Sequence, residues 1–149
     1  MNYKPLTLVA YCKSHSVLFN SSSGGIFHAL ATYVLNVLNG TVFGCTIEGS
    51  SVFHKRITSV GELKSLMKSK YVQSDLKSTF KECEQDLLNN RQVLFAGTPC
   101  IIYSLKKYLS NDKILNLENL ITVDFVCHGT PSKKYWKSYC SERFNNKIN

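Results

Sequence analysis

Short apolar runs along the chain are separated by stretches in which apolar residues recur every three or four positions. The first pattern is typical of strands and the second of helices. We therefore expect strands at residues 6–12, 41–47, 52–58, 93–96 and 120–127, and helices at residues 26–38, 60–68, 76–88, 100–109 and 131–144. Residues 13–20 and 111–119 read as loops, and Ser74 or Asp75 is the expected cap of the third helix.

The order of these elements predicts the fold class. Residues 41–47 and 52–58 are separated by a polar Glu-Gly-Ser-Ser turn, which favours a β-hairpin. The later order of strand, helix, strand, helix favours parallel pairing. We expect one α/β domain over residues 1–149, with a layered, mixed and partly parallel sheet flanked by helices and a β-hairpin in its N-terminal region. The last helix should turn Tyr135, Trp136, Tyr139 and Cys140 inward.

The tripeptide Gly-Thr-Pro follows two of the expected strands, at residues 97–99 and 129–131. Glycine permits a tight turn, threonine can cap a helix, and proline suits the first helical position. The sequence therefore predicts the same strand-to-helix corner twice. Cys100 follows the first corner and Cys127 precedes the second, so parallel neighbouring strands would bring both sulfurs to one edge of the sheet.

Several chemistries could use these two thiols. Cys100 would face the free amides at a helix N-terminus, which favour thiolate, and His128 follows Cys127 as a potential base or ligand. A cysteine hydrolase or transferase, a redox dithiol and an iron–sulfur cluster with two further ligands all remain open. No two of the six cysteines have C-x-x-C spacing, and we expect Cys12, Cys45 and Cys83 to be packed in the core.

A Ser-Ser-Ser-Gly-Gly run at residues 21–25 precedes the first long helix. Serines can cap a helix, and glycines let a ligand approach the backbone, so the run suits either an anion site or a plain helix cap. Gly44 interrupts the next strand and indicates a bulge or a close contact.

The composition excludes some classes of function. The 149 residues carry a net charge of +8, but the excess is spread along the chain without a basic stripe, so we expect no nucleic-acid partner. No apolar stretch approaches the roughly 20 residues that a membrane span needs, and no signal peptide is evident. We expect a cytoplasmic protein.

Five ordered segments resemble a known family: SSSGGIFHAL, VFGCTI, SKYVQSDL, VLFAGTPC and ITVDFVCHGTPSKKYW. Together they are similar to the coenzyme F420 hydrogenase/dehydrogenase beta-subunit family over residues 21–139. The resemblance implies an iron–sulfur flavoprotein that moves electrons between a hydride carrier, such as a deazaflavin or nicotinamide, FAD and a 4Fe-4S cluster. It also implies a ferredoxin or another electron-transfer subunit as partner.

The same resemblance assigns residues to these cofactors. Cys100 and Cys127 match two cysteines that hold the cluster. Residues that match stretches around the flavin are Ser22, Ser23, Gly24, Gly25, Lys70, Tyr71, Gln73, Ser74 and Thr98.

The chain also departs from the family. Ile101 stands where glutamine is common, and the other cluster cysteines usually lie further downstream. The chain therefore resembles the N-terminal portion of a longer oxidoreductase subunit with an incomplete set of cluster ligands. The alternative is a truncated, non-catalytic binding or assembly domain, or a remnant of such an enzyme.

Overall fold

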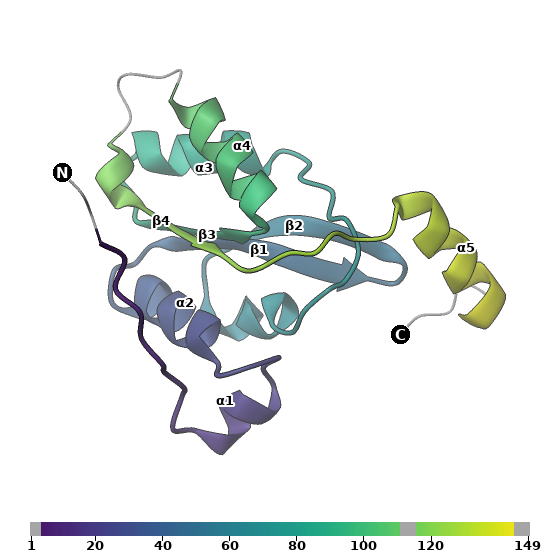
Figure 1. Cartoon of the computed structure of the whole chain (residues 1–149). Coiled ribbons are helices and arrows are strands. Elements are labelled where there is room, and N and C mark those ends of the chain that lie inside the picture. The colour runs from purple at the N-terminus through teal and green to yellow at the C-terminus, as the bar shows by residue number, and fades with distance from the viewer. Residues whose placement is uncertain (1–3, 111–115, 145–149) are drawn as a thin grey trace.

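Four strands form one sheet in the order β2-β1-β3-β4 (Figure 1). The computed structural model describes residues 4–110 and 116–144. The strands are β1 (Thr41–Glu48), β2 (Ser51–Ile57), β3 (Val93–Gly97) and β4 (Leu120–Asp124). β1 pairs with β2 antiparallel, whereas β1 with β3 and β3 with β4 are parallel. The predicted hairpin and the mixed, partly parallel sheet are thus confirmed.

Helices cover both faces of this sheet. α2 (Ile26–Asn36) and the 3-10 helix η1 (Val60–Leu66) lie on one face, and α3 (Thr79–Leu88) and α4 (Pro99–Leu109) lie on the other (Figure 1). The remaining helices are α1 (His15–Phe19), the short 3-10 helix η2 (Leu117–Asn119) and α5 (Lys133–Phe144). α5 lies beyond the turn that joins β1 to β2.

Successive side chains along a strand point to opposite faces of the sheet, so neighbouring residues pack in two separate hydrophobic cores. Val42 and Leu94 pack with α2 and η1, while Phe43 and Phe95 pack with α3 and α4. The rings of Phe43 and Phe95 stack with centroids 5.3 Å apart. A Cβ on Gly44 would lie 3.3 Å from Leu66 Cδ1, so the glycine admits η1 close to β1, as the expected close contact requires.

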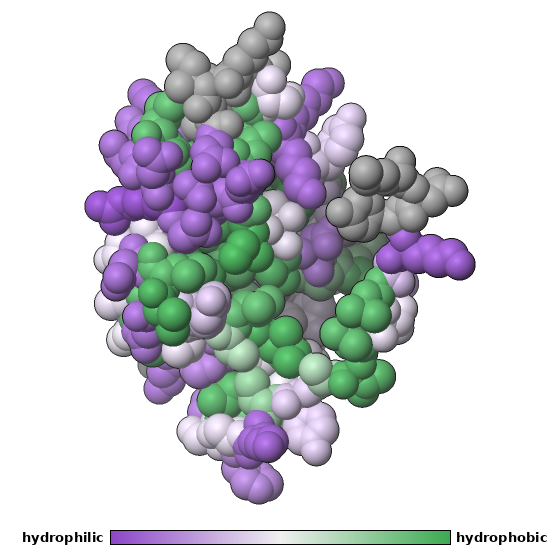
Figure 2. All heavy atoms as spheres, turned by 90° about the vertical axis from the view of Figure 1, so that its left-hand side faces the viewer, coloured by the Kyte–Doolittle hydropathy of each residue, from purple (hydrophilic) through white to green (hydrophobic). Residues whose placement is uncertain are grey.

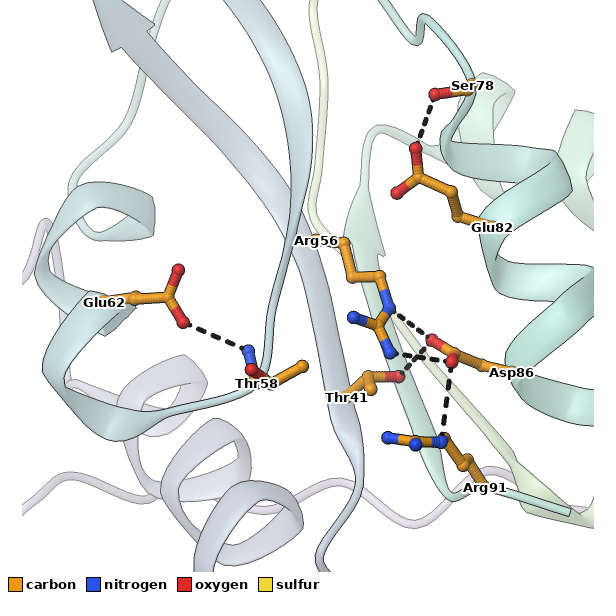
Figure 3. A network of polar contacts seen from close by, with 8 residues as sticks. All are labelled: Thr41, Arg56, Thr58, Glu62, Ser78, Glu82, Asp86 and Arg91. Carbon is orange, nitrogen blue, oxygen red and sulfur yellow. Dashed lines mark hydrogen bonds and ion pairs between the residues drawn. The ribbon is translucent and has the colours of Figure 1, made fainter. Parts of the chain in front are cut away.

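A buried carboxylate fastens α3 to the hairpin (Figure 3). Asp86 accepts two hydrogen bonds from Arg56, at 2.7 and 2.8 Å, and one from the Thr41 hydroxyl at 2.9 Å. Arg91 lies 3.8 Å away on the same carboxylate. Because only 8% of the Asp86 side chain is exposed, these partners replace the water that it loses on folding.

The N-terminal segment differs from the sequence prediction. Residues 6–12 form no strand but run as an extended segment, and the short helix α1 replaces part of the expected loop at residues 13–20. Figure 2 shows hydrophobic side chains gathered on the face where this segment runs. Its exposed apolar residues are Leu6, Leu8, Val9 and Tyr11. An apolar run forms a strand only where a neighbouring strand pairs with it, and sequence pattern cannot show that pairing.

The beginning of α3 also differs. Its N-cap is Ser78 rather than Ser74 or Asp75. Asp75 instead pairs with the edge of β2, where its carbonyl accepts from the His54 amide and its own amide donates to Val52. Of the expected loop at residues 111–119, residues 111–115 lie outside the described part.

Across residues 4–110 and 116–144, the structure contains no helix with the length and apolar character that crossing a membrane requires.

We expect Asp86→Asn to lower the free energy of unfolding by about 2–3 kcal/mol, because it leaves Arg56 without its charged partner. Urea denaturation of the purified chain measures this. The control, Glu142→Gln on the exposed face of α5, should change stability by less than about 0.5 kcal/mol. Equal effects of the two substitutions would contradict the role given to the Asp86 network.

Candidate functional site

The first Gly-Thr-Pro corner joins β3 directly to α4. Pro99 is the first helical residue, as expected, and Thr98 is at the N-cap position. Thr98 makes no side-chain cap; its Oγ1 instead lies 3.1 Å from Cys100 Sγ. A Cβ on Gly97 would lie 3.0 Å from Ile101 Cγ2. Close packing of helix against strand, rather than a left-handed turn, therefore accounts for this glycine.

The second corner has a different structure, so the prediction of two equivalent corners is wrong. β4 ends at Asp124 and α5 begins at Lys133, with an extended segment between them. Ser132 Oγ, not Thr130, accepts from a free helix amide, that of Tyr135. Gly129 has a φ of 105°, a conformation that favours glycine.

Both corners lie at the same edge of the sheet, because β3 and β4 are parallel and Gly97 is paired with Asp124. Cys100 and Cys127 are exposed, and the Gly129 amide donates to Cys127 Sγ at 3.4 Å. The described residues contain no group of three or more His, Cys, Asp or Glu side chains placed to hold a metal ion. The convergence of the two sulfurs stays a prediction.

Cys83 is fully buried in the core against α4, as expected, and burial raises the pKa of its thiol to about 12. Cys12 and Cys45 are only half-buried, and Cys12 lies in the extended N-terminal segment rather than in a strand.

The Ser-Gly run is packed against the chain's own N-terminal segment. A Cβ on Gly24 would lie 2.8 Å from the Ala10 carbonyl oxygen, and the Cys12 thiol donates to the Gly25 carbonyl at 3.2 Å. Gly25 is the N-cap of α2, with φ 76° and no side-chain cap, so the serines do not cap this helix. Chain packing explains the two glycines without a ligand.

Ser22 places the Ser-Gly run beside the second stretch that the sequence resemblance assigned to the flavin. Its hydroxyl oxygen accepts from the Ser69 amide at 2.8 Å, although the two residues are 47 positions apart. Ser23 is exposed next to it. Ser22 therefore lies beside the start of the stretch at residues 70–74, which the sequence resemblance assigned to the same cofactor.

Lys70 and Tyr71 have contrasting environments. Lys70 Nζ donates to the carbonyls of Ser65 and Met67, at 3.2 and 2.7 Å, and thereby caps the C-terminal end of η1. Burial lowers the pKa of Lys70. Tyr71 is 79% exposed, so its ring is available to a ligand.

Ser74 contacts the buried imidazole of His54, a residue that the sequence analysis missed. His54 is 2% exposed; its Nδ1 bonds to Ser74 Oγ and its Nε2 lies 3.0 Å from the Ala96 carbonyl oxygen. A carbonyl can only accept, so Nε2 carries the hydrogen and neutral Nδ1 accepts from Ser74. Burial lowers the pKa of His54, which favours this neutral form.

Cys45 belongs to the same cluster. Burial raises the pKa of the Cys45 thiol, while the Ser74 hydroxyl and the Lys70 ammonium lower it in part. One cluster thus contains Cys45, Lys70, Ser74 and His54. It extends from residue 70 to Ala96, which directly precedes the first corner.

A groove of about 660 Å³ opens between residues 64–72, the tip of the hairpin and α5. Its size is within the range of small-molecule sites. Three lysines and four aromatic side chains line it: Lys64, Lys68, Lys70, Tyr71, Tyr135, Trp136 and Tyr139. Pro131, from the second corner, lines it as well.

The aromatic residues of α5 form a wall of this groove instead of entering the core, contrary to the sequence prediction. Tyr135 is 66% exposed and Tyr139 41%, and only Cys140 among the expected inward residues is buried. Trp136 Nε1 donates to the Ser50 carbonyl at 2.9 Å and thereby attaches α5 to the hairpin. Helical spacing shows that these residues share a face, but not whether that face meets a core or a cleft.

Only some of the predicted flavin residues lie at this groove. Lys70 and Tyr71 line it, and Gln73 lines an adjoining pocket. Ser22 contacts the groove wall through Ser69. The Gly24–Gly25 backbone is occupied by residues 10–12, and Thr98 lies at the first corner.

Fold and site together define a three-layer α/β domain with an aromatic, lysine-lined groove and two thiol-bearing corners at one sheet edge. Residues 90–149 match the family model for the C terminus of the beta subunit of coenzyme F420 hydrogenase/dehydrogenase. The matched residues include both corners and α5, and the match confirms the resemblance seen in the sequence. The position of the chain within a longer subunit stays a prediction.

A solved structure has a similar fold. It is a chain from the F420-reducing [NiFe] hydrogenase complex of Methanosarcina barkeri, studied by xenon derivatization, with a TM-score of 0.69 and 15% sequence identity. The match covers 91% of this chain and 48% of that one, so this chain spans about half the length of its structural relative. No curated protein gives a significant match.

We expect the free energy of unfolding to fall as pH drops below about 6.5, the ordinary pKa of histidine. Below this pH the histidine of the unfolded chain binds a proton, whereas burial keeps His54 of the folded chain neutral. The stability contributed by neutral His54 is therefore present above this pH and is lost as the pH falls toward the lower pKa that His54 has in the folded chain. Urea denaturation between about pH 5 and about pH 7.5 measures the slope.

His54→Gln should flatten this slope, whereas His15→Gln, on the exposed helix α1, should leave it as in the wild type. An unchanged slope in His54→Gln would show that His54 is not the group responsible.

Proposed function

We propose that this chain is the flavin-binding part of an electron-transfer oxidoreductase, with FAD held in the groove between residues 64–72 and α5. The match of residues 90–149 to the F420 hydrogenase/dehydrogenase beta-subunit family model supports an oxidoreductase-related domain. A flavin can exchange a hydride with one partner and single electrons with another. The hydride carrier would be a deazaflavin or a nicotinamide, and the electron partner a ferredoxin or another subunit.

The lining of the groove carries this proposal. Aromatic side chains stack on planar rings, and ammonium groups attract phosphate, so a phosphorylated aromatic cofactor suits both kinds of residue. Tyr71 and Tyr135 are exposed enough to rearrange around a ring. Lys70 would hold one end of the ligand while it remains bonded to the end of η1.

The two corner thiols support a second, weaker part of the proposal. Cys100 and Cys127 are exposed at one sheet edge, and thiolates are the usual ligands of iron–sulfur clusters. They would supply two of the four ligands of a 4Fe-4S cluster, and the remaining ligands would come from other thiols. Pro131 lies on the groove only four residues after Cys127, so cluster and flavin would be neighbours.

The alternative, a non-catalytic domain or remnant, is not favoured by any of these observations. The chain's six free thiols suit the reducing cytoplasm, which is the location we propose.

We expect FAD to quench the fluorescence of Trp136 saturably, because it is the only tryptophan and lines the groove. Tyr71→Ala should weaken FAD binding roughly two- to tenfold through lost stacking. Tyr103→Ala is the matched control, an exposed tyrosine on α4 away from the groove. Absence of quenching, or equal loss in both variants, would refute the groove as the flavin site.

We expect anaerobic treatment with ferrous iron, sulfide and a small thiol to protect Cys100 and Cys127 from alkylation, since cluster ligands lose their free thiolates. Mass spectrometry of the alkylated peptides measures each cysteine separately. Half-buried Cys12 serves as internal control and should react equally in treated and untreated protein. Protection of Cys12 to the same extent, or of neither corner thiol, would exclude a cluster at the corners.

A further inference from the structure

The N-terminal segment and α2 form an apolar face that is open to water (Figure 2). The Cys12 amide donates to the Gly24 carbonyl at 2.8 Å, which joins the segment to the turn before α2. Soluble proteins rarely leave many apolar side chains together in water, so this N-terminal apolar face indicates a binding surface. Its members in the segment, each at least 71% exposed, are Leu6, Leu8, Val9 and Tyr11.

α2 adds a second row of apolar side chains to this face. Its inner side packs into the core through Val34 and Leu35. Its outer side exposes Ile26, Leu30, Tyr33 and Val37. Successive members of this row are separated by four, three and four positions, a spacing that places them along one side of a helix. A helix that is apolar on both sides is typical of one enclosed between two apolar media, here the protein core and a partner.

Charge indicates which partner fits this face. Glu48 is the first acidic residue of the chain, so residues 1–47 carry Lys4 and Lys13 but no carboxylate side chain. α2 itself has no Lys, Arg, Asp or Glu. The segment and the helix therefore present apolar groups and ammonium groups without acidic side chains of their own.

η1 packs against α2 and brings further positive charge to the edge of the face. It carries Lys64 and is followed by Lys68, both exposed, against one acidic residue, Glu62. Lys68 Nζ lies 5.9 Å from the centroid of the exposed Phe19 ring of α1. Apolar side chains bordered by ammonium groups match a bilayer whose headgroups are anionic.

We propose that the N-terminal apolar face docks this protein on the surface of an anionic lipid bilayer. Leu8 and Val9 enter the boundary between headgroups and acyl chains, and the rings of Tyr11 and Tyr33 lie at headgroup level with their hydroxyls in water. The lysines contact lipid phosphates. The cytoplasmic leaflet of a membrane carries such anionic lipids, so docking agrees with the location proposed above.

A second copy of the chain fits this face less well. Each copy has a net charge of +8, so two copies repel one another, whereas anionic lipid attracts the protein. Leu6 and Val9 are 81% and 100% exposed, and a fluid bilayer accommodates such projecting side chains without a shaped pocket. α5 lies at the opposite end of the molecule from the N-terminal segment (Figure 1), so docking leaves this wall of the groove in water.

Sedimentation with lipid vesicles tests the proposal. We expect the wild-type chain to bind vesicles of phosphatidylcholine and phosphatidylglycerol, and to bind phosphatidylcholine vesicles several-fold more weakly. Leu8→Ser/Val9→Ser should lower binding to the anionic vesicles about tenfold or more, because two apolar side chains no longer leave water. The matched control, Leu88→Ser/Tyr103→Ser, changes two exposed apolar residues on the opposite face of the sheet and should bind as the wild type does.

The lysines and α2 are tested separately. Lys4→Gln/Lys13→Gln should weaken binding to the anionic vesicles at low salt and have little effect at high salt, where the charges are screened. Tyr33→Ser/Val37→Ser tests the face from a regular helix, should the changes in the extended segment alter its course. This variant should also lose most of the binding.

Absence of binding to the anionic vesicles would overturn the proposal, as would equal binding by Leu8→Ser/Val9→Ser and its control. Light scattering without lipid tests the alternative occupant. A dimer that Leu8→Ser/Val9→Ser dissociates, in a chain that binds no vesicles, would overturn the proposal and assign the face to a contact between copies.

Discussion

The buried imidazole of His54 connects parts of the sheet that backbone hydrogen bonds between strands do not join. Pairing between β1 and β3 ends at Phe43 and Phe95, whereas the hairpin of β1 and β2 continues to Glu48 and Ser51. His54 reaches from β2 to the Ala96 carbonyl and stacks on the Phe95 ring, with centroids 5.6 Å apart. Through Ser74 it also holds the segment that lines the groove. One neutral side chain thus fixes the groove relative to the first cysteine corner.

The second wall of the groove depends on fewer contacts. α5 is attached to the hairpin by the bond from Trp136 to the Ser50 carbonyl and to residue 75 by Lys133. The exposed ion pair between Lys133 and Asp75 adds little stability in water, so the hydrogen bond from Trp136 contributes most of this attachment. A ligand that contacts both walls would stabilise the position of α5 by its binding free energy. Groove and helix would therefore be ordered together.

The sheet could be predicted because its strands carry strong local patterns. Residues 93–96 and 120–124 are apolar runs that end at corners, and their parallel pairing follows from the helix between them. Residues 6–12 carry an equally apolar pattern but have no neighbouring strand to pair with in the described structure. The two Gly-Thr-Pro sequences differ in structure because only the first lies where a helix starts directly from a paired strand.

The site was less accessible to sequence reasoning. Gly24 and Gly25 signalled a close approach, but the sequence could not distinguish a ligand from residues 10–12 of the chain itself. His54 and Arg56 are two positions apart and so lie on the same face of β2. His54 is buried and Arg56 is half-buried, and polar residues at such strand positions are a signal that could have identified both. The role of α5 depends on where the segment after β4 leads, which no local pattern specifies.

Nuclear magnetic resonance of the isotope-labelled chain during titration with FAD tests the central claim most directly. We expect the amide resonances of residues 68–73 and of α5 to shift together and saturably, while those of α3 and the exposed side of α4 stay unchanged. Shifts confined to the N-terminal segment or to α2, with the groove residues unaffected, would contradict a flavin site between residues 64–72 and α5.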